Sequence, residues 1–98
     1  MKKDILEFYD TRSFIDILQE ECAELISACS KYKRTIGFGF ITACPKQKAF
    51  DNLVEEIADV ENSIIAIKEL LHIDQKDIDK IIYEKDERSI RRIEESKV

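Results

Sequence analysis

Apolar residues recur at helical spacing through most of the chain and predict long amphipathic helices. The first predicted helix covers residues 13–33, where apolar side chains repeat at intervals of three, four and seven. Its apolar positions are Phe14, Ile17, Leu18, Leu25, Ile26 and Cys29. The second covers residues 46–71 and carries a longer stripe, with no glycine or proline to interrupt it. This stripe consists of Phe50, Leu53, Val54, Ile57, Val60, Ile64, Ile67 and Leu71.

A third helix is predicted over residues 75–95, with Asp74 placed to cap its first turn. Its apolar side would be formed by Ile78, Ile81, Ile82 and Ile90. Residues 34–45 contain both glycines and the single proline, and they predict a connecting loop. Residues 3–9 are compatible with either a short helix or an ordered arm. The chain is therefore predicted to be all-α.

The ends of the first long helix carry their own signals. Three residues near its start can serve as N-caps: Asp10, Thr11 and Ser13. Three cations gather near its end, where they suit the negative end of the helix dipole: Lys31, Lys33 and Arg34. These signals support a helix that ends just before the loop.

The composition indicates one folded domain over residues 1–98. Apolar residues make up 44% and charged residues 38%, which is typical of a helical protein and not of a disordered chain. A net charge of −5, without a basic stripe, disfavours nucleic-acid binding. No apolar run reaches the roughly 18 residues of a membrane span, and Asp4 and Glu7 interrupt any signal-peptide core. We therefore expect a cytoplasmic protein that binds neither nucleic acid nor membrane.

The cysteines are Cys22, Cys29 and Cys44, an odd number without a CxxC pair. This arrangement indicates neither a disulfide framework nor a zinc ribbon. We expect them to be small buried side chains in a reducing compartment.

Two pairs of carboxylates lie beside the apolar seams of the two longest predicted helices. Glu21 and Glu24 are three residues apart, and so are Glu56 and Asp59. Residues at this spacing lie on the same helix face, about 5–6 Å apart at Cβ. If the two helices pack as neighbours, four acidic groups converge, and their mutual repulsion would raise their pKa values. A divalent cation would relieve this repulsion.

Oxygen ligands alone favour a hard ion, Mg²⁺ or Mn²⁺. A di-iron bundle also uses carboxylates on paired helices, but it needs Glu-x-x-His on two of them. The chain has a single histidine, His72, at a predicted helix end. The remaining alternative is that the acids face solvent, as acidic residues on helices usually do.

The motif Glu21-x-x-Glu24 followed by Glu56-x-x-Asp59 resembles that of the MazG-like, all-α nucleoside triphosphate pyrophosphohydrolases, which include dimeric dUTPases and dCTP pyrophosphatases. The resemblance continues through ADVENSIIAIKELL and through YEKDERSIRRIEE, which is similar to the C-terminal segment of short, phage-type members. It covers residues 13–95. It implies Mg²⁺-dependent cleavage of a (d)NTP between the α- and β-phosphates, releasing a nucleoside monophosphate and pyrophosphate.

The resemblance also implies roles for individual residues. The four acids would be the metal ligands, and one of them would also orient or deprotonate the attacking water. Lys85 and Arg88 are candidates for gripping phosphate oxygens, and Asn62 for touching sugar or phosphate. Because three helices cannot close a four-helix bundle, we expect an antiparallel bundle completed in a homodimer or homotetramer.

The base-pocket signature of the dCTP pyrophosphatase branch has no counterpart in DTRSFIDILQ, so no base preference follows. Phe14, Phe38 and Phe40 can stack on a base, although Phe14 also fits a core position. An alarmone remains an alternative substrate. Two other classes of protein remain open: a metal- or nucleotide-binding regulatory bundle without turnover, and a purely structural helical oligomer.

Overall fold

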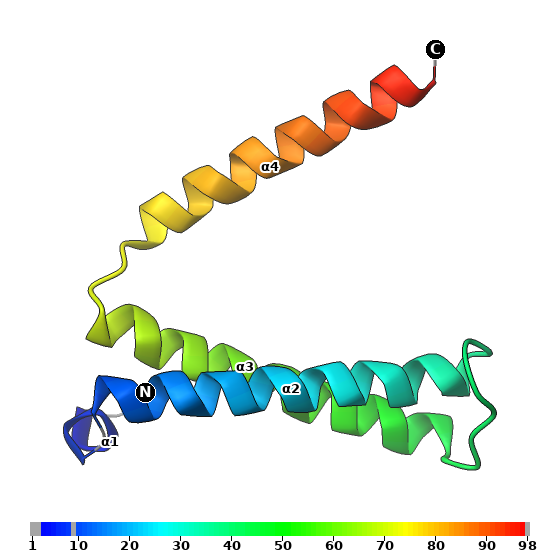
Figure 1. Cartoon of the computed structure of the whole chain (residues 1–98), viewed down its shortest axis with the longest axis horizontal. Coiled ribbons are helices and arrows are strands. Elements are labelled where there is room, and N and C mark those ends of the chain that lie inside the picture. Colours follow the sequence, from blue (N-terminus) through cyan, green and yellow to red (C-terminus); the bar gives the residue numbers. More distant parts are fainter. Residues whose placement is uncertain (1–2, 9, 98) are drawn as a thin grey trace.

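The computed structural model describes residues 3–8 and 10–97, and it is helical throughout apart from short connections (Figure 1). The four helices are α1 (Lys3–Phe8), α2 (Thr11–Thr35), α3 (Lys46–Leu70) and α4 (Gln75–Ser96). Within the described ranges there is no strand, so the predicted all-α class is confirmed. The three long helices begin and end within two residues of the predicted limits.

Helices α2 and α3 form an antiparallel hairpin and lie side by side (Figure 1). Most of the buried residues at their interface are small: Ala28, Ala49, Ser63 and Ala66. Small side chains let the two backbones approach closely, and the larger Phe14 and Val60 fill the remaining space. The core is therefore narrow and lies along the line where α2 meets α3.

Local hydrogen bonds define the helix ends. The Asp10 carboxylate accepts a hydrogen bond from the Ser13 amide at 2.8 Å, and this bond lowers the pKa of Asp10. Asp74 caps α4 in the same way by accepting from the Lys76 amide at 2.9 Å. At the end of α2, Gly37 has a φ of +94°, which glycine tolerates without the penalty of a side chain. Because the caps and the glycine after α2 act on residues only a few positions away, the limits of the helices could be predicted from the sequence.

The segment before α2 forms the short helix α1 up to Phe8, one of the two alternatives that the sequence left open. Residue 9, the last of that predicted segment, lies outside the described residues.

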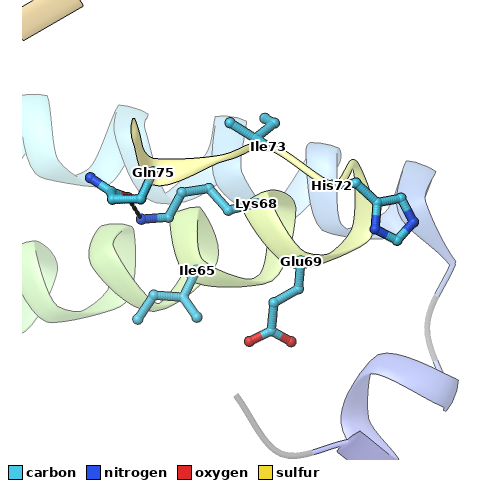
Figure 2. A pocket seen from close by; sticks show the side chains of 6 residues that line it. All are labelled: Ile65, Lys68, Glu69, His72, Ile73 and Gln75. Carbon is cyan, nitrogen blue, oxygen red and sulfur yellow. Dashed lines mark hydrogen bonds between the residues drawn. The ribbon is translucent and has the colours of Figure 1, made fainter. Parts of the chain in front are cut away.

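The end of α3 is shaped by His72, which has a φ of +54°. The Ile73 amide donates to the Lys68 carbonyl at 2.9 Å, and the His72 amide donates to the Glu69 carbonyl at 3.4 Å. This is the hydrogen-bond pattern that glycine usually supports at a helix end. Beyond it, the Lys68 ammonium donates to Gln75 Oε1 at 2.7 Å and ties α3 to the start of α4 (Figure 2).

We expect His72→Gly to raise the free energy of unfolding by up to about 1 kcal/mol, because a side chain is disfavoured at positive φ. Urea unfolding of the two proteins measures the difference. His72→Ala keeps a Cβ at the same φ and should give no such gain. A glycine variant less stable than the alanine variant would contradict this explanation of the turn.

Much apolar surface stays exposed in the single chain. On α3, the predicted stripe is only partly covered: Val60 is buried, but Val54 is 50% and Ile57 41% exposed. Helix α4 buries none of its residues, and Ile81, Ile82 and Ile90 are about half exposed. Because α2 and α3 pack mainly against each other, each covers one face of its partner, and apolar residues on the other faces stay exposed to solvent.

The expectation of buried cysteines is wrong for the single chain. Cys22 and Cys29 are exposed, and Cys44 is only partly covered. Cys22 and Cys29 lie on parts of α2 that α3 does not cover, whereas Ala28 occupies the interface. None of the described helices has an apolar stretch long enough to cross a membrane.

Candidate metal centre

The structure brings together the four carboxylates that the sequence spacing singles out. Glu21 and Glu24 come from α2, and Glu56 and Asp59 come from α3. Each residue offers one oxygen, and these four oxygens all lie within 4.8 Å of one another. The three-residue spacing puts each pair on one helix face, and the antiparallel packing of α2 on α3 brings the two faces together. The four residues could hold a metal ion.

Two of the carboxylates are poorly compensated. The Oε2 atoms of Glu21 and Glu56 are buried, and neither has a hydrogen-bond partner among the described residues. Because burial penalises the charged form, it raises the pKa of both carboxyls above the ordinary value of 4.5. The carboxylates of Glu24 and Asp59 raise both pKa values further. The charges that raise these two pKa values all belong to other carboxylates.

The donor set fits a hard divalent cation. Magnesium binds oxygen at about 2.0–2.1 Å, so ligands on opposite sides of one ion are about 4 Å apart. Oxygens within 4.8 Å of one another need only small side-chain rotations to reach that geometry. The cluster contains no histidine or cysteine, which zinc and iron sites usually include. The chemistry of the ligands therefore favours Mg²⁺ or Mn²⁺ over softer metals.

Of the three residues expected to contact substrate, only Asn62 lies on a helix that carries the carboxylates. Asn62 is exposed on α3, one turn beyond Asp59. Lys85 and Arg88 are exposed on α4, where they line a shallow hollow formed by residues of that helix alone. Helix α4, which carries these two cations, diverges from the α2–α3 pair that carries the carboxylates (Figure 1).

Two other hollows lie at the two ends of α3. One lies at the turn between α3 and α4, has a volume of about 390 Å³ and includes none of the four carboxylates (Figure 2). The other lies where α2 ends and α3 begins, with a volume of about 370 Å³. Its lining includes Lys31, Arg34 and Lys48. From the sequence, Lys31 and Arg34 were predicted to suit the helix dipole, and no signal predicted that they share a hollow with Lys48.

Comparisons of the chain with protein-family models, with curated proteins and with solved structures gave no match. The MazG-like resemblance therefore depends on the order and spacing of the motifs in this chain. The structural observation that stands independently of it is the cluster of four carboxylates from two helices.

The raised pKa values predict how stability depends on pH when no metal is bound. The folded chain binds protons at Glu21 and Glu56 more readily than the unfolded chain does, because both pKa values are raised above 4.5. Their contribution favours the folded state at low pH and is lost as pH rises through the raised values. We expect the difference in unfolding free energy between wild type and Glu56→Gln to shift in favour of the variant as the pH rises above 4.5 and through the raised pKa of Glu56.

Urea unfolding of both proteins with a chelator, at a series of pH values, measures this difference. Adding Mg²⁺ should stabilise the wild type more at high pH, where the ligands are ionised and metal binding releases fewer protons. Parallel pH profiles for the two proteins would show that Glu56 does not carry a raised pKa.

Proposed function

We propose that this protein is a Mg²⁺-dependent nucleoside triphosphate pyrophosphohydrolase of the MazG-like kind. The reaction would cleave a (d)NTP between its α- and β-phosphates to give a nucleoside monophosphate and pyrophosphate. The observation that carries the proposal is the convergence of four carboxylates, two of them with buried oxygens that have no partner within the described chain. The order of the two acidic motifs and the later basic segment supports this reaction class.

In this proposal Glu21, Glu24, Glu56 and Asp59 hold the metal. When bound, a divalent ion supplies positive charge that offsets the charge of the triphosphate and makes a nearby water more acidic. One of the four carboxylates orients that water and accepts its proton.

The water oxygen then forms a bond to the α-phosphorus, and the bond from that phosphorus to the bridging oxygen breaks. Pyrophosphate leaves with the electrons of the broken bond. The protein contributes mainly by holding the triphosphate and the water in line and by placing charge where it is needed.

We propose that the protein acts as a homodimer or homotetramer whose helices complete a four-helix bundle. The exposed apolar residues on α2, α3 and α4 support this, because a single chain leaves them without a partner helix. In such an assembly Lys85 and Arg88 of α4 would meet the triphosphate held by a neighbouring chain. Asn62 would contact sugar or phosphate near Asp59. The expected place of action is the cytoplasm, where nucleotide pools are found.

Pyrophosphate release from a panel of NTPs and dNTPs, with and without Mg²⁺, tests the function. The proposal predicts release that requires the metal. A non-catalytic binding bundle would show affinity for metal or nucleotide without any product. A structural oligomer with solvated acids would show neither product nor heat in a calorimetric titration with Mn²⁺.

A further inference from the structure

The hollow between the end of α2 and the start of α3 is basic in an otherwise acidic protein. Three of its lining residues are cations, and none is a carboxylate. The other lining residues are Thr42, Cys44, Ala49 and Asn52. The chain as a whole has a net charge of −5, so a local group of three cations around one hollow favours an anionic ligand.

The backbone adds donors at the same place. Pro45 is the N-cap residue of α3 and makes no side-chain capping hydrogen bond. The first amide groups of a helix have no partner within the helix, and here no cap side chain takes them. Lys48, which lines the hollow, belongs to this first turn, whereas the Ala49 amide already donates to the Pro45 carbonyl at 3.1 Å. The positive end of the α3 dipole therefore reinforces the three cations.

Residues that line the hollow lie on the same faces of α2 and α3 as the carboxylate cluster. On α3, Lys48, Asn52 and Glu56 follow one another at intervals of four residues and so lie along one face. On α2, Lys31 lies seven residues beyond Glu24, two turns along the same face. Along the helix axes Lys31 is therefore about 10 Å from Glu24, Lys48 is about 12 Å from Glu56, and Arg34 is about 15 Å from Glu24.

We propose that Lys31, Arg34 and Lys48 form a subsite for the terminal phosphoryl groups of the substrate. The inference rests on the proposed function, in which the α–β anhydride lies at the four carboxylates. A triphosphate that extends from there along the α2–α3 surface has its last phosphate directed toward the hollow. Flexible lysine side chains span part of the remaining distance, and their ammonium groups pair with phosphate oxygens. This subsite uses cations of the same chain, in contrast to Lys85 and Arg88.

The test compares Lys31→Ala/Lys48→Ala with Lys33→Ala/Lys46→Ala in the full-length protein. Both double variants remove two positive charges from the same two helices, but Lys33 and Lys46 do not line this hollow. Calorimetric titration with inorganic tripolyphosphate, in the presence of a chelator, measures the subsite without catalysis. We expect the first variant to bind at least about tenfold more weakly than wild type, and the control to bind within about twofold.

Steady-state kinetics of the same variants provide a second measurement. In the first variant KM for a nucleoside triphosphate should rise about tenfold, and the preference for triphosphate over diphosphate should fall, with kcat little changed. Equal tripolyphosphate binding by wild type and both variants, or no binding by wild type, would overturn the subsite. Absence of turnover in a wild type that still binds tripolyphosphate through Lys31 and Lys48 would instead overturn the proposed reaction and leave an anion site.

Discussion

Replacing Glu56 with glutamine is expected to lower metal-dependent pyrophosphate release at least about a hundredfold. Glutamine keeps the shape of the side chain but removes a negative ligand whose Oε2 is buried and has no partner among the described residues. The remaining acids would hold the metal more weakly and in a poorer geometry. Initial rates with each nucleotide over a range of Mg²⁺ concentrations measure the loss.

Glu55→Gln is the matched control, because Glu55 is the adjacent acid, is exposed and lies outside the cluster. Both variants change the net charge by the same amount. The control should keep activity within about twofold of wild type, as expected for a surface substitution. Equal losses in the two variants would show that overall charge, and not the cluster, controls activity.

Ile26→Glu is expected to weaken self-association at least about a hundredfold. Ile26 is 69% exposed in the single chain, on a part of α2 that α3 leaves uncovered. Burying an isoleucine contributes about 1.5–3 kcal/mol, and a symmetric interface contains the residue twice. A change of about 1.4 kcal/mol is tenfold in a dissociation constant, so losing both contacts has a large effect. Sedimentation equilibrium across a concentration series measures the change.

Ile41→Glu introduces the same charge at a fully exposed position in the loop before α3 and serves as the control. It should leave association unchanged. If the wild type were monomeric at every concentration, or if both variants associated like wild type, the oligomer would have to be abandoned. The helical hairpin itself should survive in both variants, because neither side chain is buried in the core.

The elements that depend on local chemistry were predictable from the sequence. Asp10 and Asp74 cap their helices, and Gly37 ends α2. Such interactions involve residues a few positions apart, so the sequence contains all their partners. The carboxylate cluster was predictable for a related reason. On each of the two long helices, two acids three residues apart lie beside the apolar seam. When the two seams pack together, the two pairs of acids are therefore brought close to one another.

The features that depend on how helices meet were not predictable in the same way. Cys29 fits the predicted apolar stripe by periodicity, but the face that α3 covers is the one that carries Ala28. The position of Lys85 depends on the direction of α4, which is determined by the turn at His72 and its positive φ. The basic hollow draws its residues from two helices and a loop, so no single segment of the sequence contains its pattern.

We propose that Glu21, Glu24, Glu56 and Asp59 share a divalent ion. Anomalous diffraction from crystals grown with Mn²⁺ tests it most directly, because the ion is located independently of the protein coordinates. We expect an anomalous peak between α2 and α3, with oxygens of all four residues turned toward it. Crystals saturated with Mn²⁺ that show no peak there, with Glu21 and Asp59 directed into bulk solvent on different sides of the assembly, would contradict it.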